Sequence, residues 1–279
     1  MAIISATEVG TTRQDLVSAV VQETLKTKAK YMGLVMDYSA SVPAGSKSVL
    51  IPRRGQFTAA DKVEDTDLTA QAFTFTQDSL TLSHKAILAE MELIADLQSA
   101  VNVEAEIIKE SAMELAKATD ELIRAQLKLA SAAAPDHILD YVDTATDVIA
   151  LADIANARKL LNVQHVPMAD RYMAVSAKKE YELLQIASFI QAERYGSSEP
   201  IVNGEIGRIL GFKVILDEEL ADAETIFWHK SAAAFAVQLS PSFEKMMNLP
   251  GVKNQYLLHT VAGAKVLQAG KCNVFYNGV

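Results

Sequence analysis

The chain has little of what marks secreted, membrane-spanning or disulfide-stabilised proteins. Its 279 residues include a single cysteine, Cys272, which excludes an internal disulfide framework and fits a reducing compartment. The longest run without a charged residue covers 13 residues, 231–243, which is shorter than the roughly 18 that a bilayer span needs. The first residues, MAIISATEVGTTRQ, lack a basic segment followed by an apolar run, so no signal peptide is expected. These absences predict a soluble cytoplasmic product.

Positive charge is also in deficit. The chain has 26 Lys and Arg residues and 35 Asp and Glu residues, which gives a net charge of −9. This charge argues against a protein that binds nucleic acid through many phosphate contacts. Half of the residues are hydrophobic and 22% are charged. The chain can therefore bury a sizeable core, in one large domain or two ordinary ones.

The sequence motifs of common catalytic and nucleotide sites are missing. No G-x-G occurs, no G-x-S-x-G occurs, and Gly263 and Gly270 lie too far apart for a phosphate-binding loop. The histidines are at least 28 residues apart and show no metal-ligand spacing, although they could still converge in space. Cys272 is expected to be a buried, inert thiol. We therefore predict no cofactor, no metal and no catalytic residue.

The least ordinary region covers residues 45–84. Two segments, SKSVLIPRR and QAFTFTQDSLTLSH, have strand character, and in the second Phe73 and Phe75 alternate with polar residues. The polar, acidic stretch between them has no compact-turn signal. The pattern predicts a long two-stranded ribbon with a mobile tip. Such a ribbon is marginal alone in water and needs a partner surface, which suggests assembly.

Charge is unevenly placed along this ribbon. Acidic side chains crowd the tip, where a calcium loop is excluded by a missing ligand position and glycine, and two arginines lie at the base. The tip is either simply solvated, or it reaches the arginines of another subunit in a symmetric assembly. The candidate inter-subunit contacts are Arg53, Arg54, Lys62, Glu64, Asp65, Asp67, Phe73 and Phe75.

Helical patterns flank the ribbon. Residues 11–30 predict a narrow amphipathic helix, and residues 87–133 predict one long helical stretch, with a possible break near Gln98. Its main part would span roughly 50 Å and is expected to pack along a sheet rather than in a coiled coil. After Pro135 the chain alternates, which indicates an α+β fold. The expected helices are 147–162 and one from Ala177, and the expected strands are 171–176, 212–217, 225–229, 254–268 and 271–277.

Three glycines precede one of these strands in the stretch IVNGEIGRILGFKVILDEEL. Their spacing misses the phosphate fingerprints, so a structural corner is predicted instead. Asn203 and Gly204 form a turn signal, Gly207 follows, and Gly211 is expected to let the backbone pass closely before the strand. The acidic run from Asp217 is expected to end that strand at the surface.

Three segments in order carry a resemblance to a known family. RYMAVSAKKEYELLQ (171–185) looks like a strand-then-helix segment, and NGEIGRILGFKVILDEEL (203–220) is similar to a pattern of N-G, I-G-x-I-x-G-F and an apolar strand. FWHKSAAAFAVQ (227–238) is similar to the strand and Ala-rich helix that come next. With the ribbon and the long helix, these segments resemble the major capsid protein of tailed bacteriophages, over nearly the whole chain.

The resemblance implies the tailed-phage major capsid fold, an α+β fold. Its parts would be an N-terminal arm, an extended β-ribbon loop (E-loop), a peripheral domain containing a spine helix at about 97–132, a mixed α/β axial domain, and C-terminal strands that return to the peripheral domain. The corresponding ranges are 1–44, 45–84, 85–135, 136–255 and 256–279.

The resemblance also implies a function and partners. The chain would be a structural, non-enzymatic protein that self-assembles as pentamers and hexamers into an icosahedral head around double-stranded DNA, which it contacts weakly and non-specifically. Expected partners are a separate scaffolding protein, a portal protein and a decoration or cement protein, without a membrane, and assembly would occur in the host bacterial cytoplasm. Some family members crosslink through a ribbon lysine, but no such site is assigned to Lys62.

Other interpretations stay open at this point. An encapsulin-like nanocompartment shell shares the fold and would form small uniform cages in electron micrographs. An α+β enzyme with a site assembled from distant residues would have a deep pocket and a small mass in solution. Decoration or tail components are further alternatives.

Overall fold

The computed structural model describes residues 30–43, 45–62, 64–65, 67–92, 103–142, 147–186, 207–248 and 252–278. Its helices are α2 (Val103–Leu127), α3 (Leu151–Val163) and α4 (Ala177–Gln185). Its strands are β1 (Met36–Asp37), β2 (Ser48–Arg54), β3 (Phe75–Thr81), β4 (Ser83–Glu92), β5 (Ile138–Leu139), β6 (Arg171–Val175), β7 (Arg208–Ile209), β8 (Phe212–Leu216), β9 (Glu224–His229), β10 (Ala233–Asn248), β11 (Lys253–Val266) and β12 (Asn273–Asn277).

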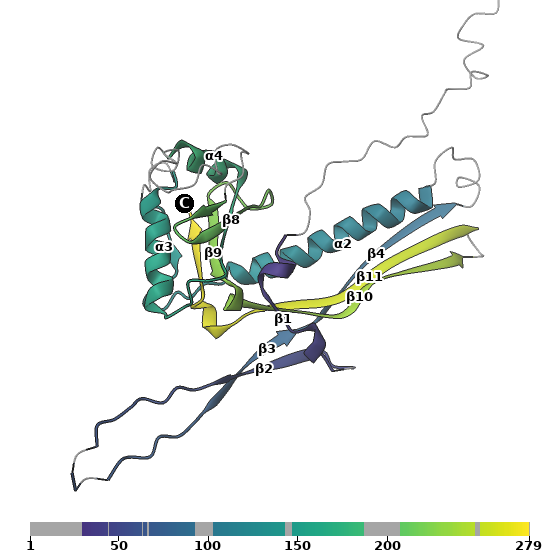
Figure 1. The fold of residues 1–279 in the computed structure, drawn as a ribbon. Helices are drawn as coiled ribbons and strands as arrows, with labels where there is room; N and C mark the ends of the chain where they lie inside the picture. The colour runs from purple at the N-terminus through teal and green to yellow at the C-terminus, as the bar shows by residue number, and fades with distance from the viewer. Residues whose placement is uncertain are drawn as a thin grey trace, which may run out of the picture.

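A long four-stranded sheet carries the helix α2 along one face (Figure 1). Its strand order is β1-β10-β11-β4, and β10, β11 and β4 pair antiparallel. Every fourth residue of α2 from Ser111 to Leu127 is buried, and such residues share one side of a helix. On β11 the even-numbered residues from Asn254 to Ala262 are buried, so these two rows face each other.

A six-stranded sheet, in the order β5-β12-β9-β6-β8-β7, forms the second body of the subunit together with α3 and α4. The central strand β9 is buried from Thr225 to Trp228. The main hydrophobic core lies on this sheet and continues across to Ile123 and Leu127 of α2. One core therefore joins the two sheets.

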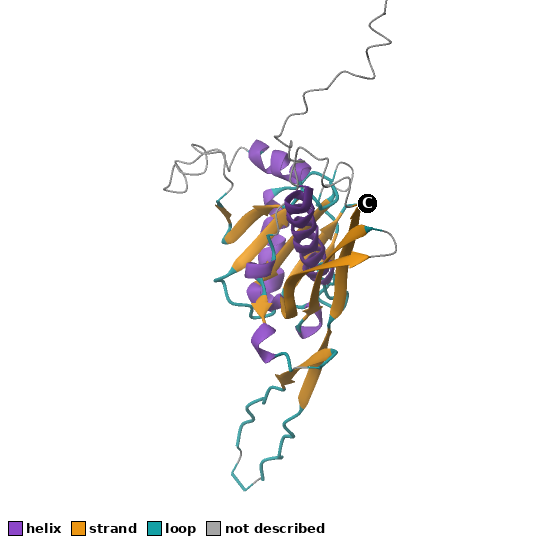
Figure 2. Ribbon diagram, turned by 90° about the vertical axis from the view of Figure 1, so that its right-hand side faces the viewer, coloured by secondary structure: helices purple, strands orange, loops and turns teal. Residues whose placement is uncertain are grey.

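The ribbon β2–β3 leaves the molecule on the face of the long sheet opposite α2, and its loop projects far beyond the other described elements (Figures 1 and 2). The two strands pair antiparallel from Ser48 with Thr81 to Arg54 with Phe75. The predicted ribbon and the α+β class are confirmed.

Sequence patterns located several elements well. The predicted strand 171–176 and the helix from Ala177 correspond to β6 and α4. The Ser176 hydroxyl accepts a hydrogen bond from the Lys179 N–H at 3.3 Å, which caps α4. The predicted strands 212–217, 225–229, 254–268 and 271–277 match β8, β9, β11 and β12, and the helix expected at 147–162 is α3.

Three predictions of element type or extent were wrong. Residues 87–92 belong to the strand β4 and not to a helix, because they pair with β11. The Ala-rich segment 231–238 is mostly the start of β10, where Ala234 and Ala236 pack against the ribbon. The strand expected at 71–84 is divided, because β3 ends at Thr81 and β4 continues from Ser83 in another sheet.

The C-terminal strands also divide differently from the expectation. β11 lies along α2, but β12 pairs with β9 and β5 in the six-stranded sheet. β10 lies in the long sheet, although all of its residues fall within the range expected for the axial domain, 136–255. The long helix expected at about 97–132 is α2, described from Val103 to Leu127, and its role as a spine helix stays a prediction. The helix expected at 11–30 lies outside the described residues, and the five-segment division stays a prediction.

The predicted glycine corner is a tight hairpin between β7 and β8. Ile209 pairs with Phe212, so the loop is Leu210–Gly211, and both residues have positive φ (46° and 90°). A two-residue hairpin loop with two positive φ angles favours glycine. A Cβ on Gly211 would meet nothing within 4 Å, so its role is this backbone conformation and not the close approach that we expected. Gly207 lies just before β7 with open space around it, and Asn203 and Gly204 lie outside the described residues.

Candidate functional site

The root of the ribbon is packed firmly on the long sheet. Inward-facing side chains of both ribbon strands are buried there against Ala234, Ala236 and Leu267. At Gly263 of β11 the ribbon comes so close that a Cβ would lie 2.3 Å from the Thr81 carbonyl oxygen. The buried ribbon residues are Val49, Ile51, Leu80 and Leu82.

Beyond this root the ribbon exposes a row of aromatic rings. Phe57 stacks on Phe73 with ring centres 5.0 Å apart, and Phe73 meets Phe75 edge to face at 5.0 Å. These rings are 62%, 42% and 66% exposed, which is unusual for three neighbouring phenylalanines. The Gly55 N–H donates to the Thr74 carbonyl at 2.8 Å and so continues the pairing past β2.

The charged ribbon residues lie at the two ends of this free part. The half-buried Arg53 donates from Nε to the Thr76 hydroxyl at 3.1 Å, and Arg54 is exposed beside it. The tip residues Lys62, Glu64, Asp65 and Asp67 are all exposed. The structure therefore places the arginines and the acidic tip as the sequence suggested, and inter-subunit contacts by either group stay a proposal.

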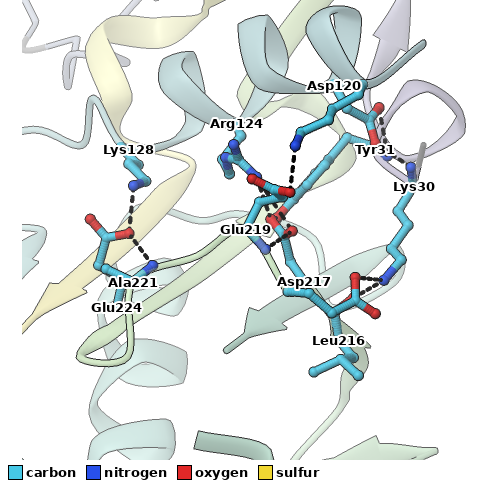
Figure 3. Close-up of polar contacts among 12 residues, drawn as sticks. Lys30, Tyr31, Asp120, Arg124, Lys128, Leu216, Asp217, Glu219, Ala221 and Glu224 are labelled. Atoms are coloured by element: carbon cyan, nitrogen blue, oxygen red, sulfur yellow. Dashed lines mark hydrogen bonds and ion pairs between the residues drawn. The ribbon is translucent and has the colours of Figure 1, made fainter. Parts of the chain in front are cut away.

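A second cluster, which sequence reasoning missed, joins three parts of the chain (Figure 3). Asp120 of α2 accepts hydrogen bonds from the backbone N–H groups of Lys30 and Tyr31, the latter at 3.2 Å. The Tyr31 hydroxyl donates to Asp217, after β8, at 2.6 Å, and Arg124 of α2 pairs with Asp217 at 3.3 Å. We call these residues the polar junction.

Further contacts surround the polar junction. Lys30 Nζ donates to the Leu216 carbonyl and pairs with Glu218, both at 2.7 Å. The Tyr31 ring packs on Trp228 of β9 with ring centres 5.5 Å apart. Together these contacts hold Lys30 and Tyr31 against α2 and against the six-stranded sheet, and so connect the two sheets of the subunit.

Asp217 corrects one expectation from the sequence. It was expected at the surface with the acidic run that it begins, but it is 2% exposed. Glu218 and Glu219, which follow it, are exposed as expected. One sequence signal for this cluster was on α2, where the polar residues Thr119 and Asp120 interrupt the apolar face. Both are buried, and a buried polar side chain requires a hydrogen-bond partner from another part of the chain.

Burial sets the protonation behaviour of the polar junction. It raises the pKa of the Tyr31 hydroxyl, which stays protonated and donates to Asp217. It also raises the pKa of Asp120 above its ordinary 3.8, although the two backbone N–H donors partly oppose this. A raised carboxyl pKa means that the folded chain binds this proton more tightly than the unfolded chain does. The contribution of Asp120 to stability therefore falls as pH rises above 3.8.

Asp120→Asn should remove this pH dependence, because an amide oxygen still accepts the two N–H groups but does not ionise. We expect the free energy of unfolding of the variant to gain on the wild type as pH rises from about 4 to about 6. Urea unfolding at several pH values measures this. Asp140→Asn, at an exposed position, is the control, and a difference between Asp120→Asn and wild type that does not change with pH would contradict the assignment.

Three further features of the described residues concern metal-ligand groups, membrane spans and the cysteine. Among them no three His, Cys, Asp or Glu side chains are grouped to hold a metal ion. No helix in the described ranges is long and apolar enough to cross a membrane. Cys272 is buried as expected, and burial raises the pKa of its thiol, which disfavours the reactive thiolate.

Comparisons with known proteins agree with this architecture. The model of the family "Phage capsid protein" matches residues 25–274. A structure from Mycobacterium phage Che8 is 22% identical, with a TM-score of 0.78, and the alignment covers 95% of this chain and 97% of that one. The capsid structure of the cyanophage P-SCSP1u is 13% identical, with a TM-score of 0.78, covering 100% and 97% of the two chains.

A third structure, of the mature capsid of bacteriophage PhiM1, is 14% identical, with a TM-score of 0.73, covering 95% of this chain and 91% of that one. No curated protein matches the sequence significantly. The encapsulin alternative is not favoured, because the family match and these three structures are of phage proteins. With a family match over most of its length, the chain belongs to the phage capsid protein family and is a structural, non-enzymatic major capsid protein of the tailed-phage type.

Proposed function

We propose that copies of this chain assemble as pentamers and hexamers into the icosahedral head of a tailed phage, around its double-stranded DNA, and that the ribbon joins each subunit to the next. The observation that carries the second part is the exposed row of Phe57, Phe73 and Phe75 on a projecting ribbon. A two-stranded ribbon is marginal alone in water, so its free half needs another surface.

The energetics favour burial of this row on assembly. Full burial of a phenylalanine side chain contributes about 1.5–3 kcal/mol, and aromatic anchors dominate the binding energy of many interfaces. A shell repeats each contact many times, so even a modest loss per subunit changes the assembly equilibrium strongly. The aromatic row is therefore the strongest candidate contact on the ribbon.

The charged ribbon residues would fix the position of the ribbon along the surface of the neighbouring subunit. We assign the exposed tip residues Glu64, Asp65 and Asp67 to a basic surface of a neighbour, and Arg53 and Arg54 to an acidic one. Lys62 belongs to the same tip. Such pairs steer association and weaken as salt concentration rises.

The remaining partners follow from membership in a capsid family. We propose a separate scaffolding protein, a portal protein and a decoration or cement protein, with assembly in the host cytoplasm. The net charge of −9 supports weak, non-specific contact with the packaged DNA, because a strongly basic surface would hold the genome too tightly for release. We also propose the five-segment division into arm, ribbon, peripheral domain, axial domain and C-terminal strands.

Replacing both Phe73 and Phe75 with serine tests the role of the ribbon. Because both rings are exposed, the stability of the isolated subunit should change by no more than about 0.5 kcal/mol, whereas the yield of shells should fall severely. Sedimentation and electron microscopy measure the yield. Met168→Ser is the matched control, since Met168 is 63% exposed on a loop of the other body. Normal shells from the double variant would refute the proposed contact.

A further inference from the structure

Two histidines that are far apart in the sequence meet on the long sheet. His84 lies on β4 and His259 on β11, and their ring centres are 5.2 Å apart, with the ring planes at 63°. In the strand register His84 is opposite Val261 and His259 is opposite Ala86, so the two imidazoles lie diagonally across adjacent strands. Such diagonal neighbours are within reach of each other.

The pair lies on the sheet face that α2 does not cover. The covered face carries Tyr256, beneath Lys245, which itself pairs with Glu104 of α2. His259 is three residues from Tyr256 and therefore points to the opposite face. His84 is exposed and His259 is half-buried, so solvent reaches both rings.

The separation of the ring centres would allow both imidazoles to bind one tetrahedral metal ion. A zinc ion holds each imidazole nitrogen at about 2.0–2.1 Å, and each nitrogen lies roughly 1.1 Å from the centre of its ring. At the tetrahedral angle of about 109°, two such ring centres are about 5.2 Å apart. The observed separation is 5.2 Å.

The surroundings also suit a cation. Ala86 and Val261, which complete the block of four residues, carry no charge that would repel it. Ser242 of β10 is directly opposite His259, and its Oγ is buried without a hydrogen-bond partner in the described structure. A water molecule bound to the ion would offer this hydroxyl a partner.

We propose that His84 and His259 form a binding site for a tetrahedral transition-metal ion of the zinc class, with water in the remaining positions. Two neutral imidazoles suit zinc and its neighbours in the first transition row. The site lies where β4 begins, directly after the ribbon returns to the sheet at Thr81. A bound ion would tie the edge strand β4 to β11 beside the ribbon root.

The test uses the untagged full-length chain, treated with chelator and then dialysed. Isothermal titration with zinc chloride should give one ion per chain. His84→Ala and His259→Ala should each weaken binding at least tenfold, because each removes one of the two protein ligands. Circular dichroism establishes that the variants are folded, which the exposed position of His84 and the solvent-accessible position of His259 favour.

Two further measurements keep the assignment falsifiable. Excess zinc should raise the melting temperature of the wild type and not that of either variant, because an ion that binds only the folded state stabilises it. Bound Co²⁺ should show the visible absorption of a four-coordinate ion. His165→Ala, at an exposed position on the other body, should bind like wild type. Wild-type affinity in His84→Ala or His259→Ala, or no binding by the wild type, would overturn the proposal.

Discussion

Lys179→Ala should lower the free energy of unfolding by about 3–5 kcal/mol, the typical cost of removing one partner of a buried ion pair. The Lys179 side chain is fully buried at the start of α4, with its ammonium 3.0 Å from the Glu182 carboxylate. The ammonium also lies 4.1 Å from the centre of the Tyr141 ring and donates to the Asp147 carbonyl. Alanine would leave the Glu182 carboxylate buried without a counter-ion.

The loss of stability in Lys179→Ala should extend beyond the ion pair between Lys179 and Glu182. The Glu182 carboxylate also accepts the Ile149 N–H at 3.0 Å, so the segment before α3 depends on the same group. Tyr141 packs on Tyr276 of β12 with ring centres 5.2 Å apart. The cation thus connects α4, the segment before α3 and the C-terminal strand.

Urea unfolding compares Lys179→Ala with Lys178→Ala, its neighbour on the exposed side of α4. The control should stay within about 0.5 kcal/mol of wild type. Lys179→Met separates the two parts of the effect, because methionine keeps most of the buried stem and removes the charge. Equal stability of Lys178→Ala and Lys179→Ala would show that the buried cation contributes nothing.

Gly263→Ala should lift the ribbon root from the sheet. The new Cβ would lie 2.3 Å from the Thr81 carbonyl oxygen and 3.0 Å from Leu80 Cδ2, so β3 must move away. Overpacking of this kind costs about 1–3 kcal/mol. Among the described strands, β2 and β3 pair only with each other, so within this part of the chain no second sheet holds a displaced root.

Hydrogen exchange of the amides in β2 and β3 is the direct measurement. We expect these amides to exchange faster in Gly263→Ala, with amides of β6 and β9 unchanged, and we expect fewer shells. Gly33→Ala is the control, because a Cβ at Gly33 meets nothing within 4 Å. Unchanged exchange in β2 and β3 would contradict the close packing at Gly263.

Sequence patterns correctly located the helices and strands whose local residue pattern favours the same structure that they adopt in the fold. From β6 to α4 the sequence contains, in order, an apolar strand segment, the helix-capping Ser176 and a helical segment. The predicted type and position of both elements were right. The ribbon was recognisable because Phe73, Phe75, Leu80 and Leu82 alternate with polar residues. In both places the local pattern favours the same structure that the distant pairing partners require.

The sequence predictions failed where pairing or packing with residues far away in the sequence decides the structure. The segment 87–92 is rich in Ala, Leu, Glu and Met, which favour helix, but pairing with β11 across the sheet decides for strand. The alanines of β10 allow close packing between the ribbon and the main core. Their composition alone favours a helix, so the sequence predicted the wrong element type. The polar junction brings Tyr31, Asp120 and Asp217 together over long sequence distances, and no local pattern encodes that meeting.

The position of β12 has a consequence for how a subunit is made. This strand lies between β5 and β9, and Val274 and Tyr276 are fully buried in it. A nascent chain cannot complete the six-stranded sheet until these late residues have left the ribosome, because pairings between distant segments wait for both partners. A chain cut before Asn273 would leave the edge of β9 unpaired and remove the contact between Phe227 and Tyr276, and such exposed surface invites aggregation or degradation. The pairing of β12 with β9 and β5 therefore makes completion of the six-stranded sheet depend on the synthesis of residues 273–277.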